Sequence, residues 1–462
     1  MKRSAIICIL SLLFISAERC VARTVSVSSA SQVNKTWRAG DTLVFSSGTF
    51  QNQSLTIQGT GTAATPIVLR AQTSGKTVLT GSSTLTISGS YIEVSGLVFR
   101  GTYTGKNHIV QFATDATRCR LTECVIESYN PTDLTKDYKW VSIKGRENRV
   151  DHCLFENKTN IGTLLVVWLE TGVIPKHRVD HNRFLTRSPL LDESGKELNG
   201  QEIIRIGDSS TSMQTAACVV EYNTFEECDG EIEIVSNKSC GNTYQGNVFR
   251  RSAGSLTLRH GNNCTVSENF FFGEGKSATG GVRIIGEGHV VQNNYFEALT
   301  GNNYRAAICI VRGKENSALN EYFQVKNAVV SGNVFVNCKE AMCVNYHSSS
   351  DCTMPSLNSR IDSNTVYNDT GNNYVLNLAA TGGSLTFLAN TYNTGKWKNY
   401  TPSEPAWLRN TQMSKPDAEQ LGLPTTNVAA TVIPIATKVI VDGQLIIEKD
   451  ERQYNIFGQR IK

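Results

Sequence analysis

Long apolar runs, heptad repeats and closely paired cysteines are all missing from this chain of 462 residues. Beyond the N-terminal segment no stretch of 18 apolar residues occurs, so we expect no integral membrane segment and a soluble mature protein. The absence of long amphipathic heptads excludes a coiled coil. No Cys-x-x-Cys pair or Cys/His cluster is present, which argues against a structural zinc. The 37 glycines instead suit many short strands and turns.

A strong charge of either sign is also lacking. Lysine and arginine number 45 against 41 acidic residues, a formal net charge of +4. Such a balance is compatible with a polyanionic ligand but does not demand one, and we expect no nucleic-acid partner.

The cysteines do not form a complete disulfide framework. Of the 13, Cys8 and Cys20 lie in the N-terminal segment, and the odd number that remains cannot all pair. Several recur inside a repeat described below, at Cys153, Cys218 and Cys264. We interpret them as buried thiols that pack like small apolar side chains.

The N-terminus has the pattern of a secretory signal. A basic start at Lys2 and an apolar run over residues 6–15, followed by small residues, predict a signal peptide over residues 1–22. We therefore expect a secreted or periplasmic protein. An outer-membrane lipoprotein anchored through Cys20 is disfavoured, because two charged residues precede that cysteine.

A short pattern, Val-x-x-Asn-x-Phe, returns along the chain. Successive copies end at Phe225, Phe249, Phe271 and Phe296, which are 24, 22 and 25 residues apart. Further copies, some weaker, end at Phe99, Phe155, Phe184, Phe335 and Tyr392. A period in the low twenties, rich in β-branched residues, Gly and Asn, is typical of a solenoid. Residues about one period apart in sequence should then be neighbours in space.

The asparagine of each copy is predicted to be structural. Asparagine tolerates the left-handed backbone of a turn, and stacked side-chain amides can hydrogen-bond as a ladder. The asparagines concerned are Asn182, Asn223, Asn247, Asn269, Asn294 and Asn333.

The repeat also sets the predicted domain boundaries. Alternating strand patterns begin near residue 24 and the repeat fades after Tyr392, so we assign residues 23–395 to one all-β solenoid. Residues 396–434 hold five of the ten prolines and are predicted to be a linker. Residues 435–462 are predicted to form a short C-terminal β tail.

The chemistry is concentrated in the middle of the solenoid. Glu231 and Glu233 alternate with Ile232 and Ile234. On a strand, residues i and i+2 point the same way, so both carboxylates should face outward while the isoleucines enter the core. Lys238 follows on the same segment.

Neighbouring coils should add to this surface. Arg259 lies 21 residues after Lys238, about one coil, which predicts that it sits beside Lys238 on the adjacent coil. The preceding coil should bring Asn199, Glu202 and Arg205 to the same face.

These residue types suit a metal-assisted proton abstraction. Two carboxylates and an amide oxygen form a hard-oxygen site suited to Ca²⁺. A cation disfavours the ammonium form of a nearby lysine, and a lysine that loses its proton can act as a general base. The alternative is a set of solvated ion pairs on an outer strand face, which would contribute little.

Three segments carry a resemblance to a known family. EIEIVSNKSCGNTY (residues 231–244), LTLRHGN (256–262) and NGQEIIRIG (199–207) resemble the active-site region of polysaccharide lyase family 6, which includes alginate lyases and chondroitinase B. The resemblance extends over residues 24–395. It implies a right-handed parallel β-helix and Ca²⁺-assisted β-elimination of uronate polysaccharides.

The resemblance also implies roles for individual residues. Lys238 matches the base and Arg259 the residue assigned as acid. Glu231 and Glu233 match the calcium carboxylates. The amide ligand is Asn199 or Gln201, of which we favour Asn199.

Other residues are candidates for substrate binding. Arg205, Arg305 and Arg312 are predicted to clamp substrate carboxylates. His260 could assist Arg259, but neighbouring residues on a strand face opposite ways, so a core or turn position is equally open. A guanidinium is not deprotonated in proteins, so charge stabilisation suits Arg259 better than proton donation.

The sequence therefore predicts a lyase acting on alginate, an anionic polysaccharide, with Ca²⁺ as cofactor. A dermatan sulfate (chondroitin B) lyase is the alternative within the same chemistry, and the modest net charge favours alginate. A polygalacturonase-type hydrolase would need clustered aspartates for acid and base work, whereas the central coils offer glutamate pairs with lysine and arginine. A non-catalytic glycan-binding β-helix would share the repeat without the Glu, Lys and Arg constellation.

Overall fold

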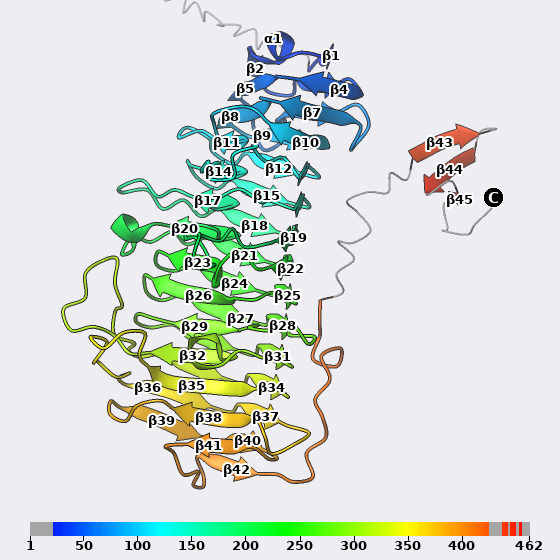
Figure 1. Ribbon diagram of the computed structural model, residues 1–462. Coiled ribbons are helices and arrows are strands. Elements are labelled where there is room, and N and C mark those ends of the chain that lie inside the picture. Colours follow the sequence, from blue (N-terminus) through cyan, green and yellow to red (C-terminus); the bar gives the residue numbers. More distant parts are fainter. Residues whose placement is uncertain (1–21, 425–436, 442–443, 450–451, 455–462) are drawn as a thin grey trace, which may run out of the picture.

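Three long parallel sheets run the length of the molecule and form the walls of a right-handed β-helix (Figure 1). The computed structural model describes residues 22–424, 437–441, 444–449 and 452–454. Each sheet contains 14 strands, and most coils give one strand to each sheet. The solenoid predicted from the repeat is therefore confirmed.

We name the sheets A, B and C. Sheet A contains β1 (Thr24–Val27), β3 (Thr42–Phe45), β6 (Ile67–Ala71), β9 (Ile92–Ser95), β12 (Arg120–Thr122), β15 (Arg149–Asp151), β18 (Arg178–Asp180), β21 (Val219–Glu221), β24 (Thr243–Gln245), β27 (Thr265–Ser267), β30 (Val290–Gln292), β33 (Val329–Ser331), β36 (Ser359–Asp362) and β39 (Leu385–Leu388). Sheet B contains β2 (Thr36–Arg38), β5 (Ser54–Thr60), β8 (Thr84–Ser90), β11 (Val110–Phe112), β14 (Val141–Ile143), β17 (Leu165–Val167), β20 (Ile204–Gly207), β23 (Glu233–Lys238), β26 (Ser255–His260), β29 (Val282–Ile284), β32 (Ile308–Val311), β35 (Glu340–Tyr346), β38 (Tyr374–Leu378) and β41 (Lys396–Lys398). Sheet C contains β4 (Gly48–Gln51), β7 (Thr77–Gly81), β10 (Leu97–Tyr103), β13 (Val125–Glu127), β16 (Leu154–Glu156), β19 (Arg183–Arg187), β22 (Thr224–Cys228), β25 (Val248–Arg250), β28 (Phe270–Phe272), β31 (Tyr295–Glu297), β34 (Val334–Val336), β37 (Thr365–Tyr367), β40 (Asn390–Tyr392) and β42 (Trp407–Arg409).

Helical structure is confined to short turns in the described residues. The α-helix α1 (Ala30–Val33) lies at the N-terminal end of the solenoid. The 3₁₀ turns η1 (Ser209–Thr211) and η2 (Asn303–Arg305) lie in loops beside sheet B. Among the described residues, none of the helices has the length and apolar character needed to span a membrane.

Stacked phenylalanines fill the interior. The last residue of each sequence repeat points inward from sheet C, and adjacent rings are nearly parallel with centroids 4.6 to 5.2 Å apart. The stack consists of Phe155, Phe184, Phe225, Phe249, Phe271, Phe296 and Phe335. Each coil thus buries its apolar face against the next coil, which is why the repeat specifies the fold.

The predicted asparagine ladder is present and is longer than expected. In a typical step, the Oδ1 atom of Asn247 accepts bonds from the backbone N–H and the side-chain amide of Asn223, both at 3.0 Å. The ladder continues through Asn364 to Asn390. The left-handed residue is the one before each asparagine, such as Glu268 at φ 58°, so the asparagine itself does not take the conformation that we expected of it.

The β-helix extends beyond residue 395, the predicted end of the solenoid. The strands β41 and β42 add to sheets B and C, and the rings of Trp397 and Trp407 pack edge to face with centroids 4.8 Å apart. Tryptophans replace the phenylalanine pattern here, so the repeat gave no signal for this coil.

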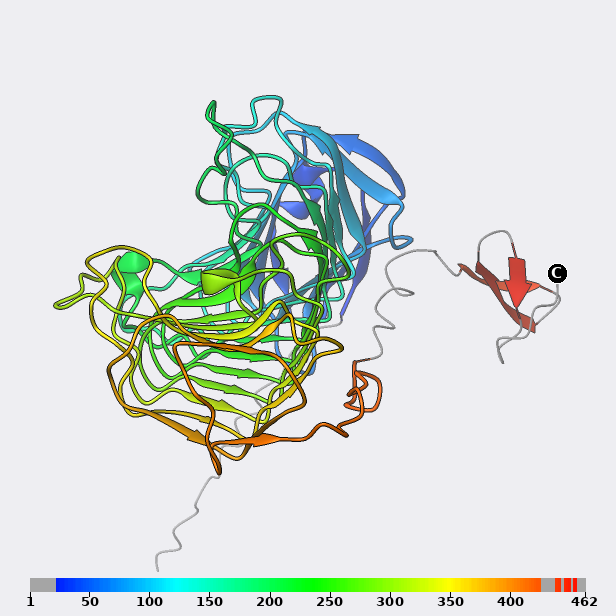
Figure 2. The same ribbon diagram turned by 60° about the horizontal axis from the view of Figure 1, so that its bottom comes forward.

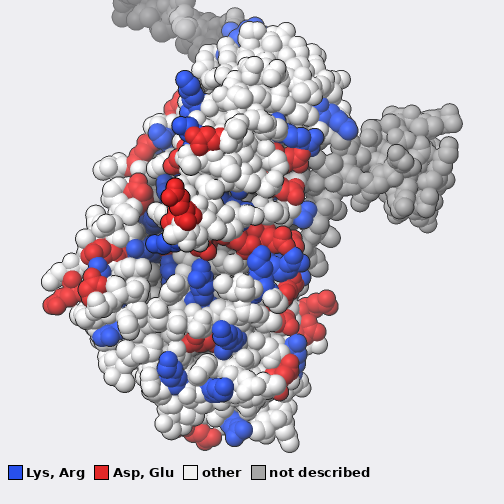
Figure 3. All heavy atoms as spheres, in the orientation of Figure 1, with Lys and Arg blue, Asp and Glu red and all other residues white. Residues whose placement is uncertain are grey.

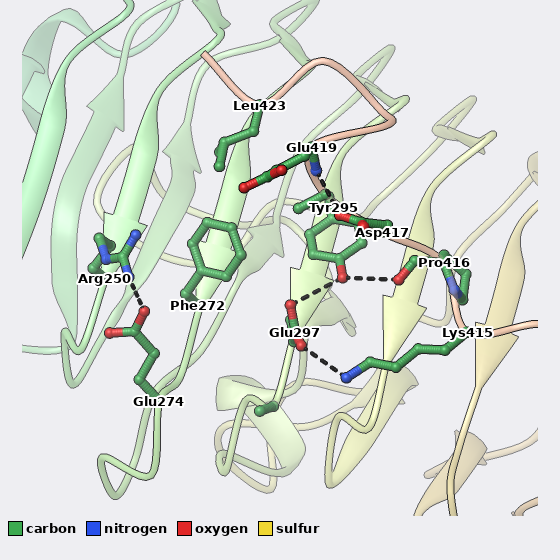
Figure 4. A pocket seen from close by; sticks show the side chains of 12 residues that line it. Arg250, Phe272, Glu274, Tyr295, Glu297, Lys415, Pro416, Asp417, Glu419 and Leu423 are labelled. Atoms are coloured by element: carbon green, nitrogen blue, oxygen red, sulfur yellow. Dashed lines mark hydrogen bonds and ion pairs between the residues drawn. The ribbon is translucent and has the colours of Figure 1, made fainter. Parts of the chain in front are cut away.

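After β42 the chain turns back along the outside of sheet C (Figures 1 and 2). Figure 4 shows Leu423 of this returning segment beside Phe272, and Lys415 paired with Glu297 at 3.2 Å. A cavity of about 580 Å³ lies beneath the segment, on a different sheet from the cavity described below.

At the C-terminus, β43 (Thr437–Val441), β44 (Gln444–Lys449) and β45 (Arg452–Tyr454) form a three-stranded antiparallel sheet. The predicted signal peptide lies outside the described residues, except for residue 22.

Candidate active site

A cavity of about 650 Å³ opens over the outer face of sheet B, at β23 and β26. Figure 3 shows basic and acidic side chains gathered side by side at mid-height of the molecule. The cavity is lined by residues 195–199 and 231–233, with Ser209, Lys238, Arg259, His260, Tyr304, Arg305 and Asn320. Both predicted catalytic residues and all three predicted metal ligands, Asn199 included, are therefore brought to one place.

Two β-bulges shape the floor of this cavity. On β23, Glu233 pairs with Ser255 and Val235 with Leu256, so Ile234 is an extra residue. On β26, Asn237 pairs with Leu258 and Lys238 with His260, so Arg259 is the extra residue.

The sequence spacing therefore gave a register that is wrong by one residue. Lys238 and Arg259 do lie on adjacent coils, as predicted, but the residue opposite Lys238 is His260. Counting residues from one repeat to the next cannot detect a bulge, because the count assumes that each residue of a strand pairs with one residue of the neighbouring strand.

Glu231 and Glu233 both line the cavity, but only Glu233 belongs to β23. Glu231 precedes the first residue of β23, so the strict alternation predicted for residues 231–234 does not hold. Ile234 is in the core, as predicted, whereas Ile232 is only partly buried and lines the cavity.

Glu231 is held by backbone groups. Its Oε2 atom accepts hydrogen bonds from the backbone N–H groups of Gly200 (2.8 Å) and Gln201 (2.9 Å). Burial, with the nearby carboxylate of Glu202, raises the pKa of Glu231 to about 8. A bound cation would favour the ionised form of this carboxylate.

Glu233 lies in the opposite environment. Burial alone would raise its pKa, but the guanidinium groups of Arg283 and Arg259 and the hydroxyl of Ser236 hold the pKa of Glu233 below its usual range. Arg283 forms an ion pair with Oε1, and Ser236 donates to Oε2 at 2.5 Å. Sequence reasoning missed Arg283, although it lies 24 residues after Arg259 and the coil period could have located it.

Arg259 is held on several sides. Its guanidinium donates to the carbonyl oxygens of Glu321 (2.7 Å) and Asn320 (3.3 Å) and lies 4.3 Å from the ring centre of Tyr322. Its Nε atom is 3.7 Å from Oε1 of Glu233. The loop that carries residues 320–322 thus fixes the position of this charge.

His260 lines the cavity but is almost fully buried. Burial and the neighbouring charge of Arg259 lower the pKa of His260 to about 4, so the ring is neutral at neutral pH. Its Nε2 atom is 3.0 Å from NH1 of Arg259, and its Nδ1 atom is buried without a partner among the described residues.

Of the three arginines predicted to bind substrate, only one lines the cavity. Arg305 lines the cavity and lies 3.9 Å from Glu197. Arg205 lies over the ring of Trp168, with its guanidinium carbon 5.3 Å from the ring centre, and is not among the residues that line the cavity. Arg312 donates to the carbonyl of Thr353 and does not line the cavity.

The two candidate amide ligands differ in their surroundings. The side chain of Gln201 is bonded to backbone groups of Leu190 and Leu198, whereas Asn199 lines the cavity. Asn199 is therefore the amide that a cation in the cavity could reach.

The donor set fits a hard cation in part. No group of three or more His, Cys, Asp and Glu side chains is placed to hold a metal within the described residues. The predicted set has only two such side chains and an amide. The carboxylate of Glu231, buried near that of Glu202, fits a cation. Both oxygens of Glu233 already have protein partners, so a cation would share them with Arg283 and Ser236.

A family model covers most of the chain. The family model described as chondroitinase B matches residues 24–401. No curated protein matches the chain.

Solved structures of polysaccharide lyases share the fold. The PL6 family alginate lyase AlyGC is 33% identical with a TM-score of 0.79, over 84% of this chain and 53% of that one. The chain thus spans about half the length of AlyGC. A mannuronic acid-specific family 6 lyase from human gut microbiota is 27% identical with a TM-score of 0.73, over 88% of this chain and 98% of that one. A PL6 lyase from Pseudopedobacter saltans, 24% identical with a TM-score of 0.65 over 86% and 99%, shares the fold.

Proposed function

This chain belongs to the chondroitinase B family, and from that membership and the cavity on sheet B we propose that it is a polysaccharide lyase that cleaves alginate by β-elimination. The observation that carries the proposal is the convergence of Lys238, Arg259, Glu231 and Glu233 on one cavity. Solvated surface ion pairs would not require burial, yet Glu231 and Glu233 are 7% and 8% exposed.

In the proposed reaction, Lys238 takes the proton from C5 of a uronate, next to its carboxylate. Arg259, fixed by the carbonyls of Asn320 and Glu321, places a permanent positive charge where negative charge develops. Arg305 would orient a substrate carboxylate. The electron pair left at C5 forms the C4–C5 double bond as the bond to O4 breaks.

We propose Ca²⁺ as the cofactor, held by Glu231, Glu233 and Asn199. When bound, it would neutralise the substrate carboxylate and lower the cost of removing the C5 proton. The raised pKa of Glu231 supports this, because its causes, burial and the nearby carboxylate of Glu202, are ones that a bound cation would offset. We also propose, from the predicted signal peptide, that the protein acts outside the cytoplasm.

One alternative substrate has specific support. The description of the family model favours dermatan sulfate as substrate. Two of the solved relatives, AlyGC and the gut lyase, are described as an alginate lyase and a mannuronic acid-specific lyase, which favours alginate. A non-catalytic glycan-binding β-helix would bind substrate without cleaving it.

The test is to incubate the purified protein with alginate, dermatan sulfate and pectate and to follow ultraviolet absorbance from the unsaturated uronate that a lyase leaves. We expect the absorbance to rise with alginate. A rise with dermatan sulfate alone would move the assignment to the alternative. New reducing ends without absorbance would indicate a hydrolase, and no cleavage of any polymer would overturn the proposal.

A further inference from the structure

Arg259 is held by a loop from a later part of the chain. Between β32 and β33 the chain leaves the sheet, and Asn320, Glu321 and Tyr322 of this loop all contact Arg259. The two carbonyls that accept its hydrogen bonds lie 61 and 62 residues further along the sequence. The position of the guanidinium therefore depends on the conformation of this loop.

Lys314 closes the loop at its base. Its backbone N–H donates to the carbonyl of Tyr322 at 2.8 Å, and its Nζ atom lies 2.6 Å from Oε1 of Glu321. Glu321 thus pairs with Lys314 through its side chain and accepts from Arg259 through its backbone carbonyl at 2.7 Å. One residue links the ammonium of Lys314 to the guanidinium of Arg259.

A second carboxylate ties the loop to the following coil. The Nζ atom of Lys314 lies 2.6 Å from Oδ2 of Asp351, in the loop after β35. Beside it, Gly313 and Met354 exchange backbone hydrogen bonds at 2.9 and 2.8 Å. Hydrogen bonds to Asp351 and Glu321 raise the pKa of Lys314, so the ammonium is charged at neutral pH.

This arrangement differs from an isolated surface ion pair, which contributes little. The side chain of Lys314 is 19% exposed, and its single ammonium joins carboxylates from two separate loops. Lys326 lines the same cavity of about 390 Å³ beside this loop. No ion pair between Lys326 and a carboxylate is found within the described residues, so Lys326 offers a matched comparison.

We propose, on the basis of the lyase function above, that Lys314 is a positioning residue of the elimination, which acts through Glu321 to fix the loop that places Arg259. Lys314 does not line the catalytic cavity. Loss of its charge frees the loop and leaves Lys238 and Arg259 in the chain, so fewer molecules hold Arg259 in the reactive position. Turnover should then suffer more than substrate binding.

The experiment compares Lys314→Met with Lys314→Arg, Lys326→Met and the wild type. For Lys314→Met we expect kcat on the preferred polymer to fall about tenfold, with KM within about twofold of the wild-type value. Lys314→Arg keeps a charge that can bridge two carboxylates and should retain at least about half of wild-type kcat. Lys326→Met should have full activity. Equal thermal midpoints would show that folding is not the cause.

A double variant tests the link to the following coil. Asp351→Asn should lower kcat in the same direction as Lys314→Met. The two changes together should lower it no further than Lys314→Met alone, because both break one ion-pair network.

Hydrogen exchange gives a readout that does not depend on activity. The amides of residues 313–323 should exchange at least about tenfold faster in Lys314→Met than in the wild type. Exchange over the same residues should be unchanged in Lys326→Met.

Three outcomes would overturn the proposal. One is a Lys314→Met protein that keeps more than about half of wild-type kcat. The others are a rise in KM with unchanged kcat, and a loop that exchanges at the wild-type rate. A wild-type protein that cleaves no polymer would instead refute the lyase function, and hydrogen exchange would then decide alone whether Lys314 holds the loop.

Discussion

Lys238 on β23 lies opposite His260 on β26, and Arg259 bulges out between Leu258 and His260. On a regular strand, neighbouring residues face opposite sides of the sheet, so Arg259 and His260 could not both reach the groove. The bulge changes this, and Lys238, Arg259 and His260 all line one cavity. A local irregularity of the solenoid thus assembles the proposed site.

The role of Lys238 can be tested directly. We expect Lys238→Ala to lower kcat on the preferred polymer by roughly 10²-fold or more, because the general base is lost. The exposed Lys106 on an early coil provides a control, and Lys106→Ala should keep full activity. Retention of more than about a tenth of wild-type turnover by a folded Lys238→Ala protein would contradict the base assignment.

The proposed cofactor gives a second prediction. Exhaustive chelation should abolish activity, and added Ca²⁺ should restore it. In calorimetric titration, Glu231→Gln should bind Ca²⁺ about tenfold more weakly or worse, because a ligand charge is lost. Glu274→Gln, on the sheet C side of the molecule, should bind like the wild type. Full activity of the demetallated protein would show that no metal is needed.

The periodic parts of the structure could be predicted from the sequence. Stacking imposes the same demand on every coil, so the phenylalanine at Phe249 and the asparagine at Asn247 repeat visibly. The pairing of Lys238 across the two strands could be predicted only to within one residue. Ile234 and Arg259 are bulge residues, and the repeat length does not reveal them.

The rest of the site comes from segments with no period. Between Phe296 and Phe335 the chain makes one coil and two loops, and these loops carry Tyr304 and Tyr322. Their contacts with Arg283 and Arg259 depend on how each loop folds over the sheet. Loop conformation is not specified by hydrophobic patterning, so neither tyrosine could be predicted.

The ladder itself should be a large source of stability. Asn247 donates to the carbonyl of Val220 and to Asn269, and accepts from Asn223. In Asn247→Ala these buried groups lose their partners, at about 1–3 kcal/mol for each. We expect a lower midpoint in urea, measured by circular dichroism. Gln245→Ala, on the same coil but facing outward, should shift the midpoint by less than about a fifth as much.

Two buried histidines should make the solenoid sensitive to acid. Burial lowers the pKa of His177 to about 3 and that of His289 to about 4. In the unfolded chain a histidine titrates near pH ~6.5. Between about pH 6.5 and pH 4 the unfolded chain therefore binds protons that the folded chain does not. Stability falls as the pH falls through this window, by up to about 3 kcal/mol for each histidine.

A second row of polar side chains, at the turn before the strands of sheet A, supplies a matched variant for this last prediction. The Nδ1 atoms of His177 and His289 accept backbone N–H bonds at positions where other coils use Asn148 and Asn242. His177→Asn combined with His289→Asn keeps an acceptor at each position and removes the titrating group. Urea unfolding at several values between about pH 7 and pH 4.5 should then show a smaller loss of stability than in the wild type. An unchanged pH dependence would mean that other groups, such as the carboxylates paired along sheet A, control the acid response.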